Sequence, residues 1–595
     1  MPTKKIIVSS LEPLESRIAP ATFTVINTSD AGAGSLRQAV LDANAHLGVD
    51  TIAFKLPVDS LILLTGGEIP VTESVNILGP GAGKLTVSGN NNSRIFNIDD
   101  SNANTLQTVK LSGLTLTNGK TTGNGGALIA KETLTLQGCV IENSTAAGAG
   151  GGVHVAADGK FSMIGTKVIG NVSSDDGGGL YVSTRGGVQI TGSLISGNTA
   201  GDQGGGLYGR VNAGGSNPKA AFVISKTIFA GNQATSDGGG AVLRNNLTGP
   251  DGMDHTKDDG AVSIQGCTFT GNRVTAGQNG GGLYAVSGNV LIQGSFFIGN
   301  STAGSGGGIG TSTAVDSLTI KSTRVSGNLT TDGAQLGGAG LFAHGAFVTT
   351  IQASSFSGNK SANDGGGILI NDGQTVKIAS TVFTNNFALG DDGGAIYLDP
   401  NAGAAVNLDV KASKFIDNNA ISSGAGISAA GAPGGTLSIT ASMFTGGFAG
   451  SDSGAIDTDG AWAIAIKASK FTGNFARNEG GALYLRSTAA VSITSSIFTQ
   501  NVSVTGNGGA ISFGGTGAKV ISSSIFRDNT TNFTGGAISM FGTGSLAIVS
   551  TTITGNVAKV NGGGIANYTG NSGSLVITTS NITGNSAPVN PQIKN

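Results

Sequence analysis

The chain has 595 residues, of which 102 are glycine and only 12 are proline, and its formal net charge is −2. So much glycine argues against a packed helical bundle, because glycine weakens helices, and the low proline content excludes collagen. The balanced charge gives no electrostatic basis for binding nucleic acid or an anionic membrane, and no apolar run is long enough for a transmembrane helix.

Residues 1–21 form the first distinct segment. Lys4 and Lys5 precede a short apolar run, which Glu12 and Glu15 interrupt. The sequence Ala-Pro-Ala at 19–21 has the small side chains of a site at which export signals are cleaved. The pattern predicts an atypical export or targeting segment.

Residues 22–109 are predicted to hold an N-terminal cap and the first coils of a repeat. A capping-box sequence begins at Ser35, and Gly48 can end the helix. The apolar residues between them have helical spacing: Leu36, Val40, Ala43 and Leu47. We expect this amphipathic helix to cover the open end of the stack, next to the first strands at 51–56 and 61–64.

Residues 110–590 repeat one unit, and its clearest marker is an asparagine. Phe or an aliphatic residue lies three positions earlier, and a Gly-Gly-[Gly/Ala] turn follows six to nine positions later. The markers are Asn143, Asn171, Asn198, Asn232, Asn272, Asn300, Asn328, Asn359, Asn386, Asn418, Asn474, Asn501, Asn529, Asn556 and Asn585, with Gly447 in place of one. The aromatic residues before them are Phe229, Phe269, Phe297, Phe356, Phe383, Phe415, Phe444, Phe471, Phe498 and Phe526.

The length of this unit decides between repeat architectures. Stretches such as 221–224, 490–494 and 546–549 alternate apolar and small polar residues, as half-buried strands do. A unit of about 28 residues is too short for a β-propeller blade and lacks the leucine frame of leucine-rich repeats. We therefore predict an all-β parallel solenoid of about 17 or more coils, a rod on the order of 80 Å long, with Phe and Asn in internal columns.

Three segments carry a resemblance to known families. Residues 22–25, 34–39 and 50–54 resemble the opening of bacterial right-handed parallel β-helix surface proteins, and Gly-Gly-Ala-Ile at 508–511 with Phe-x-x-Asn resembles the repeats of polymorphic outer-membrane proteins. Residues 11–21 are similar to the LEPR-XLL segment of planctomycete and verrucomicrobial exported proteins, although Ser16 and Ala19-Pro20 depart from the commoner residues. The resemblance implies export, a right-handed, pectin-lyase-like β-helix and a surface or adhesin role. Where an autotransporter would continue into a membrane-inserted domain, this sequence ends in a tail at 591–595, so self-insertion into an outer membrane is not expected.

Catalytic residues are not predicted, although polysaccharide lyases and hydrolases share this fold. Polygalacturonase-like enzymes carry Gly-His-Gly and Arg-Ile-Lys motifs, whereas His344 here stands in Ala-His-Gly and no Arg-Ile-Lys exists. The histidines at 46, 154, 255 and 344 have no ligand spacing. Arg210, Arg244 and Arg273 fall in successive coils but are assigned to different phases of the repeat, so we do not expect them to converge.

Acidic residues precede the glycine turn in five coils, at Asp176, Asp237, Asp364, Asp392 and Glu479. They form either a stripe that binds cations or sugars, or good turn chemistry, since Asp is favoured before Gly. Other coils place Gln203, Asn279, Asn507 or Asn561 there, which favours the turn interpretation.

The longest step between markers, Asn232 to Asn272, contains an insertion rich in carboxylates and glycine. Its acidic residues, Asp251, Asp254, Asp258 and Asp259, are our candidate ligands for one calcium ion, although the spacing is not that of an EF-hand. A solvated acidic loop is the alternative. Cys139 and Cys267 lie four repeats apart, roughly 19 Å, and should be free, core-facing thiols, because a disulfide needs Cα atoms within about 7 Å.

The function we predict is that of an exported, surface-associated β-helix protein, a non-enzymatic adhesin or cell-envelope spacer whose partner is a polysaccharide or another cell-surface ligand. The alternative is a secreted β-helix protein that binds or cleaves polysaccharide. A lateral groove that gathers carboxylates, Arg or Lys and aromatic residues from neighbouring coils would favour that alternative. A third hypothesis, a component of a larger assembly, requires the secreted protein to form ordered arrays.

Overall fold

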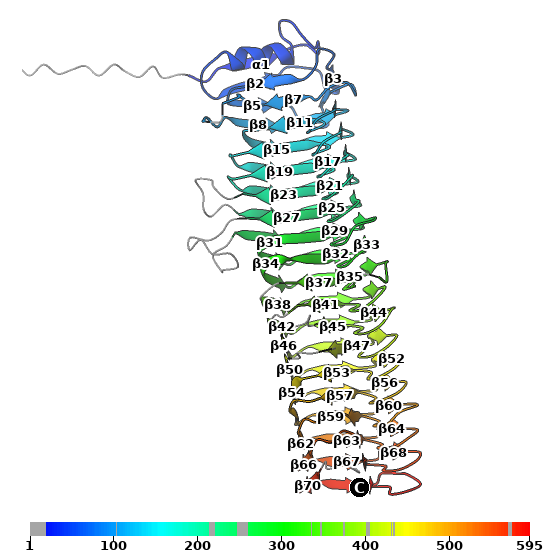
Figure 1. Cartoon of the computed structure of the whole chain (residues 1–595). Coiled ribbons are helices and arrows are strands. Elements are labelled where there is room, and N and C mark those ends of the chain that lie inside the picture. Colours follow the sequence, from blue (N-terminus) through cyan, green and yellow to red (C-terminus); the bar gives the residue numbers. More distant parts are fainter. Residues whose placement is uncertain are drawn as a thin grey trace, which may run out of the picture.

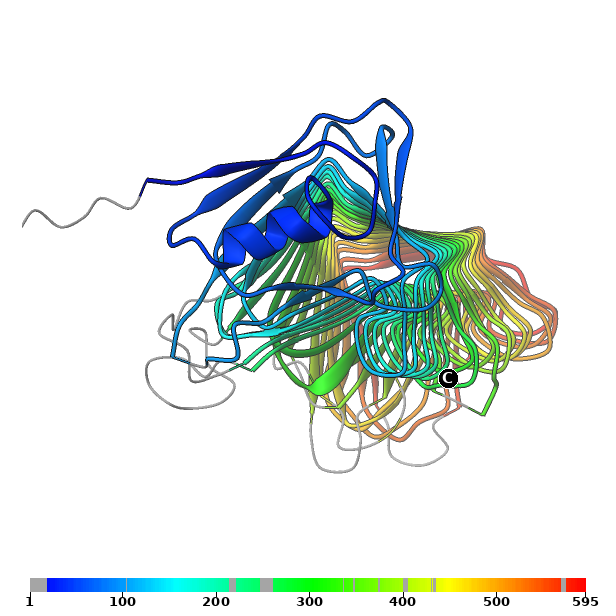
Figure 2. The same ribbon diagram turned by 90° about the horizontal axis from the view of Figure 1, so that it is seen from above.

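The computed structural model describes residues 19–594 except 103, 213–220, 247–259, 335, 346–347, 373–374, 400–404, 430, 432–434 and 569–573. The described chain winds through about 19 turns of a right-handed parallel β-helix (Figure 1). The predicted fold class is therefore confirmed. Seen from above, the coils lie almost over one another and form one continuous stack (Figure 2).

Strands of successive coils pair in parallel ladders. One ladder has 19 strands in the described chain, from β3 (Ser60–Leu63) to β71 (Asn581–Thr583), and another has 16, from β10 (Lys120–Thr121) to β68 (Val557–Ala558). The third sheet joins two ladders, because β31 (Leu283–Gln293) and β34 (Ile309–Lys321) are long enough to belong to both. Each coil therefore rests only on its neighbours, as expected for a solenoid.

The phenylalanine column is present and buried. Phe471 lies between Phe444 and Phe498, with ring centroids 4.9 and 4.7 Å away and ring planes within 7° of parallel. Val325 interrupts the column and separates the stack 229–297 from the longer stack 356–526. The predicted aromatic column is thus confirmed in two parts.

The asparagine column is a buried hydrogen-bonded ladder. The Nδ2 of Asn501 donates to the Phe471 carbonyl at 3.1 Å and to the Oδ1 of Asn529 at 2.8 Å, and its backbone N–H donates to the same Oδ1 at 3.0 Å. Both Asn474 donors reach the Oδ1 of Asn501 in the same way. The ladder satisfies turn amides and carbonyls that burial would otherwise leave unpaired.

Two positions of this ladder differ from the asparagine pattern. Asn143 is exposed in a left-handed conformation (φ 52°), and Ser144 takes the ladder position instead, donating its N–H to the Oδ1 of Asn171. The prediction for Asn143 was therefore wrong by one residue. Gly447 has no side chain and contributes to the ladder only through its N–H, which donates to the Oδ1 of Asn474. An asparagine does not fit at this position, because its Cβ would lie 1.9 Å from the Gly454 carbonyl oxygen.

A second ladder, of hydroxyl groups, lies two residues before the aromatic column and was not predicted. The N–H of Ser469 donates to the Oγ of Ser496, while the Oγ of Ser469 donates to the Lys467 carbonyl. Cys139 and Cys267 occupy this column, and their N–H groups donate to Thr166 and Ser295. Both cysteines are buried and free, as predicted.

The N-terminal end of the stack is covered by α1 (Leu36–Asn44), which packs on β1 (Thr22–Val25), β2 (Asp50–Phe54) and β4 (Ile69–Val71). Ser35 caps the helix by accepting the Gln38 N–H, but the Gln38 side chain bonds Asp42, so the capping box is only half formed. The helix ends before Gly48, and Leu47 is exposed, because the chain has already turned toward β2. The prediction that Leu47 belongs to the apolar face was wrong.

Arg37 fastens this cap to the first coil. Its guanidinium donates to the Asp30 carboxylate at 2.7 Å and to the backbone oxygens of Gly67 and Glu68 at 2.7 and 2.8 Å. Within the described residues, no helix has the length and apolar character that crossing a bilayer requires.

Candidate functional site

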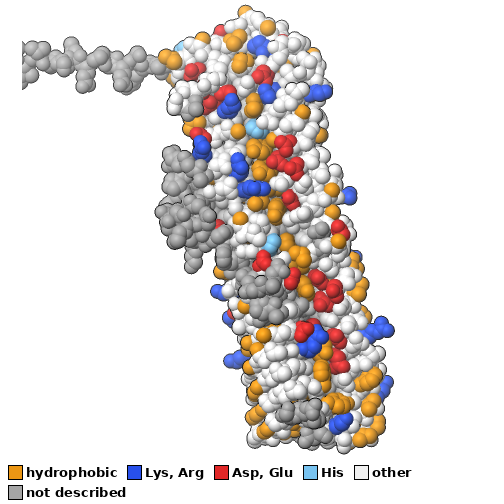
Figure 3. All heavy atoms as spheres, in the orientation of Figure 1, with side chains coloured by type: hydrophobic (Ala, Val, Ile, Leu, Met, Phe, Trp, Pro, Cys, Tyr) orange, Lys and Arg blue, Asp and Glu red, His pale blue; other side chains and the backbone are white. Residues whose placement is uncertain are grey.

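One face of the rod carries a continuous strip of non-repeating side chains (Figure 3). Hydrophobic side chains run along its centre, acidic side chains gather beside them, and Lys and Arg side chains lie next to this line in the upper half and again near its lower end. In its N-terminal half the strip lies on β15 (Val153–Ala157), β19 (Leu180–Thr184), β23 (Leu207–Val211), β27 (Ala241–Asn245) and β31. We call the outward side chains of this ladder, together with the acidic residues before its glycine turns, the lateral strip.

The centre of the strip is an outer aromatic column. Strand register aligns His154, Tyr181, Tyr208, Val242 and Tyr284. The His154 and Tyr181 rings stack 4.7 Å apart, and those of Tyr181 and Tyr208 5.2 Å apart, both within 3° of parallel. Because the ring faces cover one another, a ligand can reach only their edges and hydroxyl groups.

Burial decides the protonation of these rings. It lowers the pKa of His154 to about 4, so this imidazole is neutral near pH 7, and its buried Nδ1 has no hydrogen-bond partner. Burial raises the pKa of Tyr181 and of Tyr208, which therefore remain protonated hydrogen-bond donors. The column offers hydroxyl groups rather than bases.

Two arginines stand side by side next to this column. Arg210 and Arg244 are register partners on β23 and β27, which corrects our assignment of them to different phases of the repeat. Each lies twelve residues after a ladder asparagine, Asn198 or Asn232, so the sequence did contain the signal. Arg273 belongs to a different ladder, on β30 (Arg273–Val274), as expected from its position.

The surroundings of the two guanidinium groups are aromatic and polar. The guanidinium carbon of Arg244 lies 5.8 Å from the centre of the Tyr208 ring, and an Nη of Arg210 lies 3.5 Å from the Oγ of Ser183. The Nε atoms of both arginines are buried without a hydrogen-bond partner. The donors that a ligand on this face can reach are therefore the Nη groups of these half-buried side chains.

The acidic residues before the glycines tie successive coils together. One carboxylate oxygen of Asp176 accepts the Gln203 N–H, at 3.1 Å, and one of Asp364 accepts the Asp392 N–H, at 2.8 Å. Asp237 does the same with Asn279. These contacts give the carboxylates a structural role between coils, and they engage one of the two oxygens of each carboxylate in this way. Desolvation and neighbouring acids raise the pKa of Asp176 to about 6 and that of Asp364 to about 7.

The C-terminal half of the strip lies on β41 (Ile368–Asn371), β45 (Ile396–Asp399), β53 (Ile456–Gly460) and β57 (Leu483–Ser487). Asp457 is 3% exposed, and its Oδ1 has no hydrogen-bond partner. Arg486 lies 3.6 Å from this carboxylate and 4.7 Å from the centre of the Tyr484 ring. Burial raises the pKa of Asp457 well above its ordinary value, although the positive charge of Arg486 lowers it.

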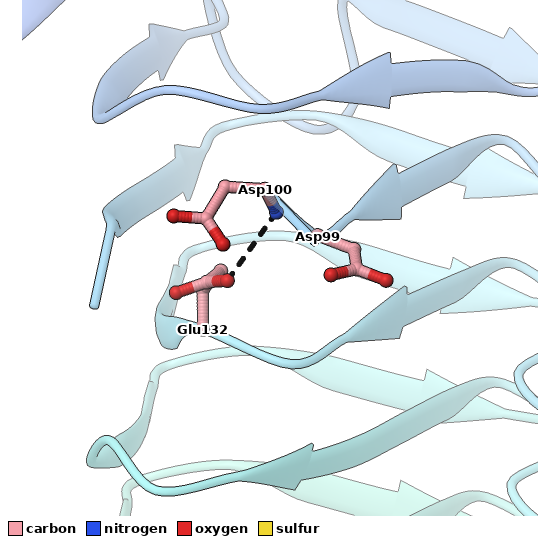
Figure 4. A group of neighbouring side chains, drawn as sticks. All are labelled: Asp99, Asp100 and Glu132. Atoms are coloured by element: carbon pink, nitrogen blue, oxygen red, sulfur yellow. Dashed lines mark hydrogen bonds between the residues drawn. The ribbon is translucent and has the colours of Figure 1, made fainter. Parts of the chain in front are cut away.

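A pocket of about 390 Å³ near the N-terminal end contains three carboxylates from two coils, Asp99, Asp100 and Glu132 (Figure 4). Their oxygens lie within 4.8 Å of one another, close enough for one cation. Glu132, however, accepts the N–H groups of Asp100 and Gln107, at 3.4 and 2.8 Å, and Asp99 pairs with Lys131 at 2.7 Å. These carboxylates therefore already hold a loop in place.

A similar acidic group, Asp175, Asp176 and Asp202, borders the strip. The predicted calcium ligands Asp251, Asp254, Asp258 and Asp259 all lie outside the described residues, as does His255. The other histidines share no site: His46 contacts Asp50 and His344 contacts Asp372, whereas His154 belongs to the strip.

Comparison with known proteins supports the fold and leaves the ligand open. The family model described as the right-handed β-helix region matches residues 255–438. No curated protein matches the sequence. A solved structure, that of the PL6-family alginate lyase AlyGC, aligns over 95% of this chain and 100% of its own, at 10% identity and a TM-score of 0.22. A TM-score this low supports no statement about the function of this chain.

Proposed function

We propose that the protein is an exported, surface-associated β-helix protein that binds an extended polysaccharide along the lateral strip without cleaving it. The observation that carries the proposal is the gathering of tyrosines, arginines and carboxyl groups from successive coils on one face. Such a gathering is expected of a rod that binds glycans and is not needed in a rod that acts only as a spacer.

The spacing of the strip suits a polymer. Successive coils lie about 4.8 Å apart, which is close to the advance per sugar of an extended glycan. A linear polysaccharide laid parallel to the rod would therefore meet the side chains of one coil at each sugar, and these side chains differ from coil to coil. Because strand pairing holds these groups in place before binding, little conformational entropy is lost.

The chemistry of the strip favours binding over cleavage. General base catalysis needs a group that is free to take a proton near the working pH. Tyr181 and Tyr208 remain protonated. The two carboxyl groups whose pKa burial raises to about 6 and 7, Asp176 and Asp364, each use one oxygen to hold the next coil. We therefore expect no turnover of pectate, alginate or uncharged glucans, with or without calcium.

The proposed cellular location rests on the resemblance of the N-terminal segment to export signals. The LEPR-XLL-like residues 11–21 support export, and a rigid rod capped at one end suits a position at the cell surface or within the envelope. Binding glycan along the strip gives such a rod an adhesive function.

The test is a glycan array probed with the secreted chain and with a variant that lacks two strip hydroxyls, Tyr181→Phe/Tyr284→Phe. The rings stay in place in this variant, so we expect correct folding and at least a fivefold loss of affinity for the best ligand. The control is Thr268→Val/Thr552→Val, which removes two hydroxyls from the separate ladder that runs from β3 to β71 and should bind normally. Binding to no glycan would refute the proposal, and new reducing ends or unsaturated sugars above a heat-killed control would refute its non-enzymatic part.

A further inference from the structure

Arg210 and Arg244 differ from the other arginines of the rod in what surrounds them. The arginine ion pairs of the described chain involve Arg37, Arg94, Arg185, Arg486 and Arg527. Within the described residues, neither Arg210 nor Arg244 has a carboxylate at ion-pair distance. The same holds for three exposed arginines, Arg273, Arg324 and Arg477. Arg210 and Arg244, in contrast, are half-buried and lie side by side, where a ligand can reach both.

Because the two arginines are neighbours without a carboxylate partner in the described chain, their positive charges repel each other. Register partners on parallel strands lie about 4.8 Å apart, so two positive charges face each other on neighbouring coils. Half-burial weakens the screening of their repulsion by water and salt. A single oxyanion between the two guanidinium groups would remove the repulsion and accept hydrogen bonds from their Nη groups, as carboxylate, sulfate and phosphate do from arginine.

The neighbouring acidic residues limit how much negative charge the site takes. Asp176 and Asp237 lie close enough to Arg244 for its charge to lower the pKa of each carboxyl group, although burial, the larger effect, raises both. Farther along the strip the balance reverses, since Asp364, Asp392 and Asp399 line it without an arginine partner in the described residues. A polyanion laid along the whole rod would meet these carboxyl groups.

Resting on the proposed function, we propose that Arg210 and Arg244 form a subsite for one carboxylate or sulfate group of an otherwise largely neutral polysaccharide. The neutral sugars of that polymer lie over the tyrosine hydroxyls and carboxyl groups on either side. The strip thus selects glycans with sparse acidic groups against neutral chains and against polyanions.

The test uses the full chain, calorimetry and two matched pairs of polymers. The first pair is a glucuronoxylan and the same polymer after its carboxyl groups have been reduced to alcohols. The second is a sparsely sulfated galactan and its desulfated form. We expect at least one acidic member to bind tenfold or more tightly than its neutral partner, and more tightly than polygalacturonate.

Variants assign that preference to the arginine pair. Arg210→Gln/Arg244→Gln should bind the acidic and neutral members equally, with affinity for the neutral member unchanged, and Arg210→Lys/Arg244→Lys should restore part of the preference because the charge returns. Arg273→Gln/Arg324→Gln, on other ladders, should behave as the wild type. Unchanged affinity for the neutral member also shows that the glutamine variant is folded.

The possible failures are distinguishable. Equal binding of both members of both pairs by the wild type overturns this inference and leaves the proposed function standing. A preference that survives in the glutamine variant, or tighter binding of polygalacturonate, also overturns it. Failure to bind any of these polymers and any glycan on the array overturns the proposed function itself.

Discussion

The inner columns and the lateral strip are built on the same coils but follow opposite rules. Inside, one position holds Phe415, Phe444, Phe471 and Phe498 in successive coils. Outside, the aligned position changes from Tyr208 to Val242, Tyr284 and Gly310. An inner residue must fit the copies above and below it, whereas an outer residue is free to vary. Variation along an outer ladder is therefore where the function of a solenoid is expected.

The two regions also differ in how well their polar groups are satisfied. Each ladder asparagine from Asn474 to Asn529 has both its donor and its acceptor engaged. On the strip, Arg210, Arg244 and Asp457 keep buried atoms without partners. Unsatisfied buried groups cost stability, and the polar groups of the strip are less well satisfied than those of the inner ladder.

The largest effect is expected inside the stack. Phe471→Ala removes a fully buried ring between two others and should cost about 3–5 kcal/mol. Because coils couple only to their neighbours, hydrogen exchange should quicken in the coils around Phe471 and remain slow at both ends of the rod. The control is Phe448→Ala, since Phe448 also stacks on a phenylalanine but is 43% exposed, and its cost should be below that of Phe471→Ala. Equal costs, or exchange that quickens uniformly along the rod, would contradict the solenoid coupling.

A smaller but still large effect is expected in the asparagine ladder. Asn501→Ala leaves the Phe471 carbonyl and the Asn474 N–H without buried partners, at a cost of about 2–3 kcal/mol. Asn143→Gly is the control, because Asn143 lies outside the ladder in a left-handed conformation that glycine adopts without strain. Chemical unfolding followed by hydrogen exchange measures both. Comparable losses for the two variants would mean that the ladder is not a stabilising feature.

The repeat predicted the fold because positions that stack on one another in successive coils carry the same residue types at a regular spacing in the sequence. The columns of Phe471 and Asn501 follow from spacing alone. The strip was missed because its residues do not repeat, although Arg210, Arg244 and Arg486 each lie twelve residues after a ladder asparagine. The exposure of Leu47 arises because the helix ends at Asn44, before the apolar spacing does, and the burial of Asp457 leaves no mark in the periodic pattern.

The pH dependence of stability should differ between the strip and the acidic pocket near the N-terminal end. The folded-state pKa of Asp364, about 7, lies above its ordinary value of 3.8, so the folded chain holds this proton more tightly and loses stability as the pH rises from about 4 to 7. Asp364→Asn removes this loss and keeps an oxygen for the Asp392 N–H, so it should raise the melting temperature at pH 8 more than at pH 4.5.

Asp99→Asn is a control of opposite sign. The hydrogen bond from Lys131 lowers the pKa of Asp99, so its ionised form stabilises the fold above the ordinary pKa and that stability is lost as the pH falls. This variant should therefore lower the melting temperature at pH 8 and have less effect at acid pH. The same sign for both variants would contradict the assignment of desolvation to Asp364 on the strip and of pairing to Asp99 in the N-terminal acidic pocket.

The smallest effect is expected from calcium at the insertion that follows β27, next to Arg244. Asp251, Asp254, Asp258 and Asp259 supply oxygen ligands of the kind that calcium prefers, so calcium should slow proteolysis between residues 245 and 262 and leave distant coils unchanged. Limited proteolysis with calcium or a chelator, together with titration calorimetry, makes the measurement. The fourfold Asp→Asn variant of these residues is the control, and it should show neither heat nor protection. Since binding would stabilise only the state that holds the ion, its effect should grow with calcium concentration. No heat and no change in cleavage with the wild-type chain would remove the calcium site and leave the insertion as a solvated acidic loop, with the inner columns and the strip unaffected.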